Sequence, residues 1–330
     1  RPRDWSSDVC SSDLLPPRTL VMRRNGGPWT IEASPNATLL PDNGLGAVTC
    51  RGADKCVAVG WNSSGANDAH TLIERWNGTR WELQATPNVR GADLNLLGGI
   101  SCPTATRCWA VGYWVAPGRV RPLVLRGDGS DWSIVPVPAM PDASVLLDVR
   151  CPVAGTCFAV GARFVDDQLR TFAARFDAVA WRPVSTPNRP GVDQELRAIS
   201  CPTAAWCLAV GVASDGGEGQ HTLALRRNGA GWALLPSPNA PGSDVSELNG
   251  ISCPAVDDCM AVGAAIGATG WQPFAARRRA GAWSTAIPPV AAGAVDAGLS
   301  GVACRAGPIC AAVGARSDGD IWRSYITQYG

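Results

Sequence analysis

The sequence predicts an all-β protein, a β-propeller of four-stranded antiparallel blades, and three repeated features carry that prediction. Pairs of cysteines six residues apart recur every 49 to 52 residues. Each second cysteine opens a run that ends in Ala-Val-Gly, and a further apolar strand, a turn and a tryptophan follow. Four strands in about fifty residues is the size of one propeller blade, and such regularity indicates a repeat architecture.

The cysteines are the most regular element of the repeat. Two cysteines at the ends of a short strand connection are placed to form a disulfide, whereas zinc sites favour ligands two to four residues apart and usually include histidine. The sequence has two histidines, His70 and His221. We therefore expect six disulfides, which imply an oxidising compartment and hence a secreted or cell-surface protein. The expected pairs are Cys50 with Cys56, Cys102 with Cys108, Cys151 with Cys157, Cys201 with Cys207, Cys253 with Cys259, and Cys304 with Cys310.

The strands after each cysteine pair are predicted from alternation and turn signals. Small residues alternating with valine in the Ala-Val-Gly run are typical of a tightly packed inner strand. A turn follows the next strand, and a tryptophan stands three residues past the turn's second residue; Asn-Gly and Asp-Gly turns predict a hairpin. The turns are Asn25-Gly26, Asn77-Gly78, Asp128-Gly129, Asp177-Ala178 and Asn228-Gly229.

The period also sets the expected domain limits. Residues 4–14 resemble a translated sequencing adapter, so residues 1–14 are interpreted as an artefactual leader outside the fold. Residues 15–330 are expected to form a single β-propeller domain. Its repeats are 15–40 (partial), 41–91, 92–140, 141–191, 192–242, 243–293 and 294–330 (partial).

The two partial repeats decide the predicted blade number. The first begins at its third strand, and the last ends before its tryptophan strand. We infer a seven-bladed parent in which the N-terminal segment donates the strand that the last blade lacks. A six-bladed ring with one surplus strand is the alternative.

Composition excludes several classes of partner. The formal net charge is +1, so no electrostatic footprint for nucleic acid is expected. No apolar run reaches the roughly eighteen residues of a membrane helix, and no metal-ligand cluster or phosphate-binding glycine loop predicts a cofactor. A monomer without cofactor or metal is expected.

An arginine and an aspartate also recur in each repeat. They predict either a charged ring that grips a ligand on the axis or a structural device for salt bridges or turn capping, and the structural interpretation is favoured. The arginines are Arg23, Arg75, Arg126, Arg175, Arg226 and Arg277; the aspartates are Asp42, Asp93, Asp142, Asp193, Asp244 and Asp296.

The tryptophan hairpin resembles the Asp-box turn of sialidase-type propellers, although the box aspartate is absent. The repeat as a whole resembles the Ser-Cys-x5-Cys-x-Ala-Val-Gly repeats of uncharacterised secreted bacterial propeller proteins, over residues 15–330. The first resemblance implies a propeller fold, and the second brings no activity with it.

The sequence favours a recognition or scaffold module over an enzyme. A sialidase-like site needs a tyrosine with a glutamate nearby, but Glu195, Glu247 and the other glutamates are scattered without a pairing that suggests two catalytic carboxylates. No catalytic residue is assigned, and a sialidase-like glycoside hydrolase or other propeller enzyme is the alternative. The loops after each Ala-Val-Gly strand vary, and their aromatic residues are candidates for binding a glycan or a protein partner. These are Trp61, Tyr113, Trp114, Phe164 and Trp271.

Overall fold

The computed structural model describes most of the chain as antiparallel sheet and contains no helix in the residues it describes. These are residues 18–24, 27–37, 40–65, 67–214, 217, 219–229, 231–290, 292–305 and 309–329. The expected leader, residues 1–14, and the Asn25-Gly26 turn lie outside them. The chain divides into two compact units, Arg1–Pro138 (unit 1) and Ala139–Gly330 (unit 2).

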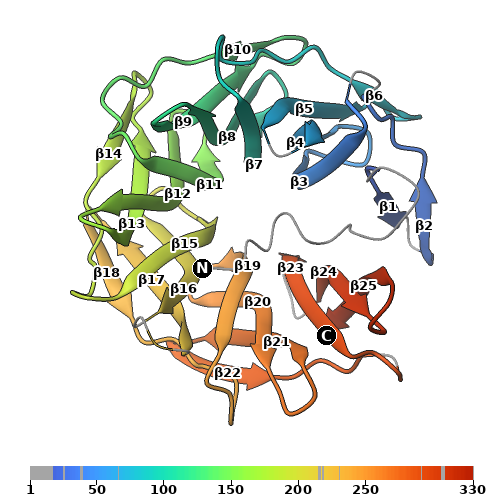
Figure 1. Cartoon of the computed structure of the whole chain (residues 1–330), viewed down its shortest axis with the longest axis vertical. Coiled ribbons are helices and arrows are strands. Elements are labelled where there is room, and N and C mark those ends of the chain that lie inside the picture. Colours follow the sequence, from blue (N-terminus) through green and yellow to red (C-terminus); the bar gives the residue numbers. More distant parts are fainter. Residues whose placement is uncertain are drawn as a thin grey trace. The chain divides into compact units, whose positions relative to one another are not determined.

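Unit 1 holds a two-stranded hairpin followed by two four-stranded blades (Figure 1). The hairpin is β1–β2, blade 1 is β3–β6 and blade 2 is β7–β10. A single parallel pairing, Ala69 with Leu94, joins the two blades into one eight-stranded sheet. The strands are β1 (Val21–Arg24), β2 (Trp29–Glu32), β3 (Asp42–Cys50), β4 (Cys56–Gly65), β5 (Asp68–Trp76), β6 (Trp81–Leu83), β7 (Leu94–Thr104), β8 (Arg107–Ala116), β9 (Arg119–Gly127) and β10 (Trp132–Ile134).

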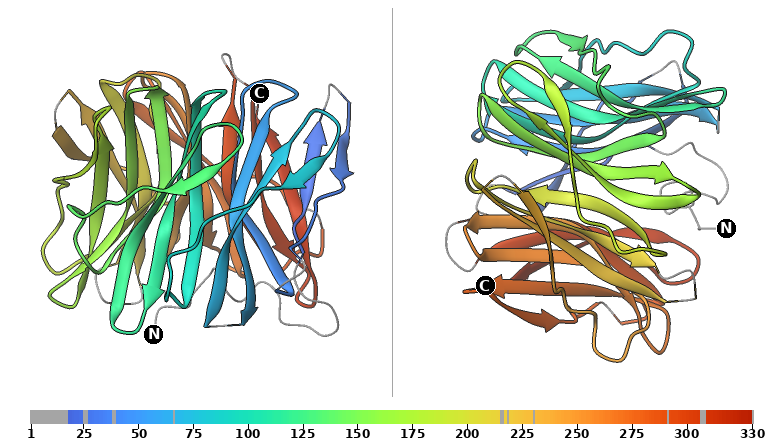
Figure 2. Two further views of the ribbon diagram at one scale, coloured as in Figure 1. Left: turned by 90° about the horizontal axis from the view of Figure 1, so that it is seen from above. Right: turned by 90° about the vertical axis from the view of Figure 1, so that its left-hand side faces the viewer.

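Unit 2 holds three four-stranded blades and one of three strands, each antiparallel and in chain order (Figure 2). Blade 3 is β11–β14, blade 4 is β15–β18, blade 5 is β19–β22 and blade 6 is β23–β25. The strands are β11 (Ser144–Val153), β12 (Thr156–Val165), β13 (Gln168–Phe176), β14 (Trp181–Val184), β15 (Asp193–Ser200), β16 (Trp206–Ser214), β17 (Gln220–Asn228), β18 (Gly231–Leu235), β19 (Ser246–Ala255), β20 (Asp258–Ile266), β21 (Trp271–Arg279), β22 (Ala282–Ala286), β23 (Asp296–Cys304), β24 (Cys310–Ser317) and β25 (Trp322–Tyr329).

The four-stranded blades confirm the predicted β-propeller class. Within unit 2, the first strand of each blade contacts the first strand of the next, as Figure 1 shows for β11, β15, β19 and β23. The β1–β2 hairpin lies within residues 15–40, and blade 6 has three strands in the described residues. The seven-bladed parent and the donated closing strand stay predictions.

The Ala-Val-Gly run forms the second strand of every blade, where it is paired on both sides. Its glycine is required by a β-bulge in the first strand, which brings a carbonyl oxygen over it. A Cβ at Gly211 would lie 2.0 Å from the oxygen of Glu195, and a Cβ at Gly263 would lie 2.0 Å from that of Glu247. Because only glycine tolerates this approach, the bulge explains the glycine that ends each run.

The bulge places one extra residue in the first strand of each blade. In all six blades the pairing of the first strand with the second shifts by one residue, between a leucine and the residue two positions after it. The side chain of a bulged residue often points in a different direction from those of the regular pleat. The bulged residues are Gly46, Gly98, Leu147, Arg197, Asn249 and Ser300.

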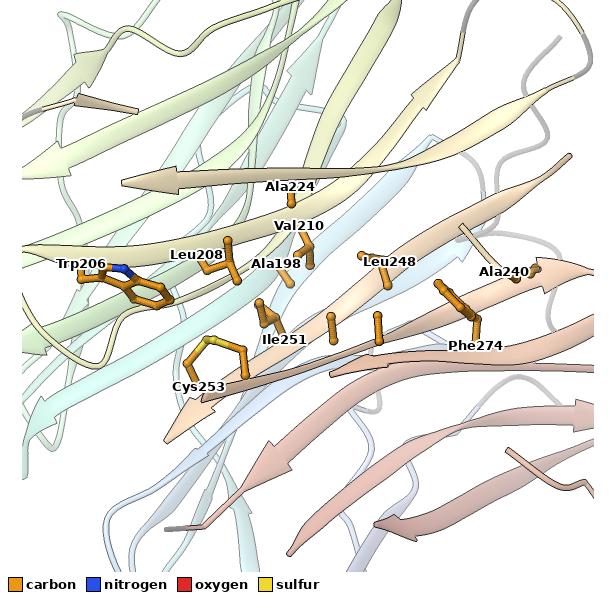
Figure 3. Packing of buried hydrophobic residues seen from close by; sticks show 14 residues of the cluster. Ala198, Trp206, Leu208, Val210, Ala224, Ala240, Leu248, Ile251, Cys253 and Phe274 are labelled. Carbon is orange, nitrogen blue, oxygen red and sulfur yellow. A yellow bond between two sulfur atoms is a disulfide. The ribbon is translucent and has the colours of Figure 1, made fainter. Parts of the chain in front are cut away.

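The apolar core lies between neighbouring blades rather than within one. Between blades 4 and 5, Leu208 and Val210 of β16 pack with Leu248 and Ile251 of β19 and with Phe274 of β21 (Figure 3). Each of these side chains is buried. Adjacent blades therefore stabilise one another by burying apolar surface.

All six predicted disulfides are present. Each joins the end of the first strand of a blade to the start of the second, with Cα atoms 4.0–4.1 Å apart. The predicted tryptophans are the first or second residues of the fourth strands. Each pairs with the last or penultimate residue of the third strand, as Trp81 pairs with Trp76 with ring centroids 5.9 Å apart. Each four-stranded blade thus has a crosslink between its first two strands and a tryptophan contact between its last two.

Candidate functional site

Each blade has two edges, and the hydrogen bonds identify them. At one edge, the hairpin between the second and third strands meets the start of the next blade's first strand; we call this the loop edge. Leu169 N donates to Asp193 Oδ1 (2.8 Å), and Trp271 N donates to Asp296 Oδ1 (2.8 Å). The disulfides and the tryptophan turns lie at the other edge, which we call the cysteine edge.

The repeated aspartates and arginines make structural contacts. The aspartates hold the neighbouring hairpin, through the carboxylate at Asp193 and Asp296 and through the backbone carbonyl at Asp93 and Asp244. The arginines contact other groups: Arg277 pairs with Asp258 (3.3 Å), and Arg23 lies over the Trp76 ring (4.8 Å). These contacts fit a structural role, which the sequence favoured. They do not match a charged ring that binds a ligand.

The five aromatic candidates are divided between the two units. Trp61, Tyr113 and Trp114 belong to unit 1, and Phe164 and Trp271 belong to unit 2. The indole of Trp61 lies across Gly44 of the neighbouring strand, and Trp114 packs on the core between blades 1 and 2. Both therefore cover their own sheets, and Tyr113 is likewise partly buried.

Phe164 and Trp271 keep access to the loop edge of unit 2. Phe164 is 58% exposed beside a hairpin tip where Asp166 and Asp167 both have positive φ. Trp271 is partly buried at the start of β21, opposite Ile266. The use of either side chain in ligand binding stays a prediction.

Around Trp271 the loop edge carries several exposed or partly buried apolar residues, which we call the rim patch. Gly270 abuts the backbone of Val295, Val295 N donates to Ser317 O (2.8 Å), and Ser317 pairs with Trp322 across the last hairpin. These contacts link blades 5 and 6 along one edge. The rim patch consists of Ile266, Trp271, Val295, Ile321 and Trp322.

The rim patch contains one of two well-exposed aromatic side chains in the described part of the chain. These are Trp322, 36% exposed, and Phe164, and both lie on the loop edge. Trp322 was not predicted, because only loops up to residue 272 were considered as candidates. Acidic and basic groups flank it: Arg323 Nη1 donates to Asp318 Oδ2, and this bond together with the Ile321 N–H lowers the pKa of Asp318 to about 2.

A second feature is a polar cluster on the first strands of blades 4 and 5. Arg197 Nε donates to Glu195 Oε1 (2.5 Å), and Arg197 Nη1 donates to Glu247 Oε2 (2.6 Å) and Asn249 Oδ1 (2.7 Å). Asn249 Nδ2 donates in turn to Glu247 Oε1 (3.0 Å) and to Leu299 O (3.3 Å) in blade 6. Two bulged residues, Arg197 and Asn249, therefore build this cluster.

The sequence suggested no catalytic pairing of Glu195 and Glu247, but in the structure one guanidinium binds both. Each stands six residues before the first cysteine of its repeat, so adjacent blades bring them together. Aligning the repeats on their cysteines would have revealed the pair. Other blades hold Gly44, Leu96, Val145 and Gly298 at this position.

The positive charge of Arg197 is compensated by direct contact with the carboxylates of Glu195 and Glu247. Burial lowers the pKa of Arg197, but Glu195 and Glu247 raise it by more, so it lies above its ordinary value. The guanidinium therefore stays charged, and its hydrogen bonds to both carboxylates hold the cluster together. Glu247 is buried, while Glu195 and Arg197 are partly exposed.

Asp148 in blade 3 is a related departure from the repeat. It stands where other blades have glycine or alanine, and its Oδ2 accepts a hydrogen bond from Ile199 N of blade 4 (2.9 Å). Burial raises its pKa, against the opposing effects of Arg150 and of the N–H groups of Ile199 and Val149. The first strands of blades 3 to 6 are thus linked by polar contacts at positions that break the repeat.

Two further classes of site are absent from the described residues. No group of three or more histidine, cysteine, aspartate or glutamate side chains is placed there to hold a metal ion. No helix in this part of the chain is long and apolar enough to cross a bilayer.

These features define a β-propeller protein whose blades carry one disulfide each and whose loop edge presents an aromatic surface. No protein-family model matches the chain, and no curated protein matches it. A solved protein of unknown function from Dyadobacter fermentans is 12% identical, with 84% of this chain and 91% of that one covered and a TM-score of 0.58. At this identity the likeness shows a shared fold alone.

Two neuraminidase-like proteins of bat isolates are also similar in structure. The subtype N10 neuraminidase-like protein from the little yellow-shouldered bat in Guatemala is 10% identical, with coverage of 86% of this chain and 92% of that one and a TM-score of 0.47. The subtype N11 neuraminidase-like protein from the flat-faced bat in Peru is 8% identical, with coverage of 83% and 84% and a TM-score of 0.46. Neither likeness bears on the activity of this chain.

Proposed function

We propose that this protein is a non-catalytic recognition module that works outside the cytoplasm and binds a glycan through the rim patch. The observation that carries the proposal is the position of Trp271 and Trp322 on the loop edge of blades 5 and 6, with the Asp318–Arg323 pair beside them. Aromatic rings stack on the apolar faces of sugars, and charged groups at their margin bind hydroxyls.

The disulfides support the location. Six crosslinks of this kind persist in an oxidising environment and are rare where thiols are kept reduced. A secreted or cell-surface position agrees with a module that meets extracellular glycans.

A glycan array with the complete chain tests the proposal. Trp322→Ala should lower the affinity for the sugar that binds best by about tenfold or more, as is usual for an exposed aromatic anchor. Ile309→Ala is the matched control, because Ile309 is an exposed apolar residue of the same blade at the cysteine edge. Equal affinity of both variants and the parent would refute binding through the rim patch. If the protein binds a protein partner and no sugar, it is still a recognition module, but its ligand is a protein rather than a glycan.

A glycoside hydrolase is the second candidate, and the polar cluster is the observation that favours it. Glu195 and Glu247 come within hydrogen-bonding distance of one guanidinium, and glycosidases use two carboxylates. If the protein hydrolyses a glycoside, and Glu195→Gln and Glu247→Gln each abolish turnover while folding normally, the hydrolase replaces the recognition module.

A further inference from the structure

A small cavity lies at the cysteine edge between blades 1 and 2 of unit 1. Its volume is about 40 Å³, and the polar residues that line it include Thr49, Thr104 and Gln84. One water needs at least about 10–15 Å³, so the cavity has room for about three waters or one small polyatomic ion.

Three cations line the cavity, and no carboxylate does. They are Arg51, Lys55 and Arg75, all from blade 1. Arg51 Nη1 donates to Cys102 O (2.9 Å) and to Pro103 O, and Arg75 Nη1 donates to Gly129 O, so blade 2 carbonyls fix both guanidinium groups. In the part of the chain that the structure describes, no ion pair neutralises any of the three.

The acids nearest in sequence do not line the cavity. Asp54 precedes Lys55 and is exposed, but it does not line the cavity. Asp128, beside Gly129, accepts hydrogen bonds from the backbone N–H groups of Ser130 and Asp131. The cavity is therefore a concentration of positive charge with fixed donors.

In blade 5, the residues equivalent to Arg75 and Lys55 form an ion pair. Arg277 of blade 5 corresponds to Arg75, because each pairs with the residue after the second cysteine of its repeat. Asp258 corresponds to Lys55, because each precedes that cysteine. Arg277 and Arg279 both pair with Asp258, at 3.3 and 3.6 Å. Blade 1 replaces this neutralising acid with a further cation.

Arg51 is a second departure from the repeat. It follows the first cysteine, where blades 2 to 5 have a proline: Pro103, Pro152, Pro202 and Pro254. Two of the three cations thus stand where most other repeats carry no positive charge. Like charges held around one cavity repel one another unless an anion occupies it.

We propose that this cavity is an anion-binding site for a tetrahedral oxoanion, a sulfate or phosphate group. Arginine and lysine donors arranged around a small cavity match the acceptor oxygens of such a group. The site goes beyond the proposed function, because it lies at the cysteine edge of unit 1 rather than on the rim patch.

The test uses the complete, disulfide-bonded chain and sodium sulfate or sodium phosphate as the probe. Sodium chloride at the same ionic strength is the reference. We expect a saturable rise in Tm with sulfate or phosphate and a measurable heat of binding by calorimetry. A rise no larger than that in chloride, without a saturable heat, would overturn the proposal.

Lys55→Asp reproduces the arrangement around Asp258. It should raise the Kd for sulfate by about tenfold or more, because an internal carboxylate then competes for Arg75. Arg80→Gln is the matched control: Arg80 is an exposed cation of the same blade that pairs with Glu82 (2.8 Å), and its loss should leave the Kd unchanged. An unchanged Kd in a correctly folded Lys55→Asp protein contradicts the site.

A reciprocal change keeps the proposal testable if Lys55→Asp fails to fold. Asp258→Lys gives blade 5 the arrangement of Lys55 beside Arg75 and should add a second saturable sulfate response. If no second response appears, the arrangement of charges is not what makes the cavity bind sulfate.

A comparison of two affinities distinguishes an oxoanion carried on a glycan from a free ion. A sulfated monosaccharide that binds more tightly than inorganic sulfate shows that the oxoanion is carried on a glycan. Equal affinities show a free ion, and both outcomes support the site.

Discussion

Blades 1 and 5 are built from the same repeat but differ in how they place charge. In blade 5, Glu247 is bound by Arg197 of blade 4, and Asp258 is paired with Arg277. In blade 1, Lys55 stands beside Arg75 without an acid, and Glu74 is buried with an oxygen, Oε1, that has no hydrogen-bond partner among the described residues.

The difference shows which residues the fold requires. Both blades have the disulfide, the bulge and the Ala-Val-Gly glycine, because these make contacts within a single blade. The charges vary at positions that face another blade or a cavity. We infer that such positions are where one blade can acquire a function without loss of the repeat.

The largest expected effect comes from removing the cation that joins blades 4 and 5. Arg197→Leu leaves Glu247 buried beside Glu195 without a counter-charge, and we expect a loss of about 3 kcal/mol in the free energy of unfolding. Urea unfolding at pH 7, followed by circular dichroism, measures it.

A matched control separates charge from packing at this position. Blade 3 has Val145 and Leu147 where blade 4 has Glu195 and Arg197. The triple variant Glu195→Val, Arg197→Leu, Glu247→Val should therefore recover most of the loss, because no buried charge remains. A loss below about 1 kcal/mol for Arg197→Leu alone would mean that solvent screens the cluster as it does a surface pair.

A smaller effect of opposite sign is expected in blade 1. Glu74 stands where blades 2 and 4 have Leu125 and Leu225, and burial raises its pKa above 4.5, although Ser34 Oγ donates to its Oε2. Because the folded state holds the proton more tightly than the unfolded state, stability declines as the pH rises above 4.5. Glu74→Leu should be more stable than the parent at pH 7, by about 1–3 kcal/mol.

The pH dependence gives the check on Glu74. The advantage of Glu74→Leu should shrink toward about pH 4, where the carboxyl is protonated in the folded state and largely protonated in the unfolded state. Glu247→Leu in blade 5 is the comparison, and it should destabilise the protein because Glu247 is paired. A destabilised Glu74→Leu protein at pH 7 would show that the Ser34 hydrogen bond outweighs burial.

Much of the fold was predictable from sequence because its signals are local. The cysteine pairs, the turn before each tryptophan and the four strands of a blade depend on residues within one repeat, and the structure confirms them. The bulge was missed, since it leaves no signal except the recurring glycine on the facing strand, as at Gly211. That glycine was interpreted only as a small residue of a packed strand.

The candidate site was predictable only in part because it depends on contacts between strands and between repeats. Trp61 was a candidate for ligand binding, but Gly44 opposite it leaves space for the indole to lie on its own sheet. Glu195 and Glu247 are far apart in the chain and meet because adjacent blades place equivalent residues side by side. Neither contact follows from composition or from the cysteine spacing within one repeat.

The smallest expected effect concerns the tryptophan turns of blades 1 and 2, which make the same hydrogen bonds with different chemistry. Asn77 Oδ1 accepts from Thr79 N (2.9 Å) and Arg80 N (3.0 Å), and Asp128 Oδ1 accepts from Ser130 N (3.0 Å) and Asp131 N (2.9 Å). The hydrogen bonds from Asp131 and Ser130 lower the pKa of Asp128 to about 2.

A lowered pKa adds stability above pH 3.8, and that stability is lost as the pH falls toward 2. Asp128→Asn should therefore make Tm less sensitive to acid between about pH 4 and about 2, because an asparagine makes the same turn without titrating. Asn77→Asp should introduce the same acid sensitivity into blade 1. Thermal unfolding across this pH range compares the two variants with the parent, and the effect is small because the Asp128 carboxylate is fully exposed. Equal acid sensitivity of all three proteins would show that the turn hydrogen bonds do not distinguish the charged from the neutral acceptor.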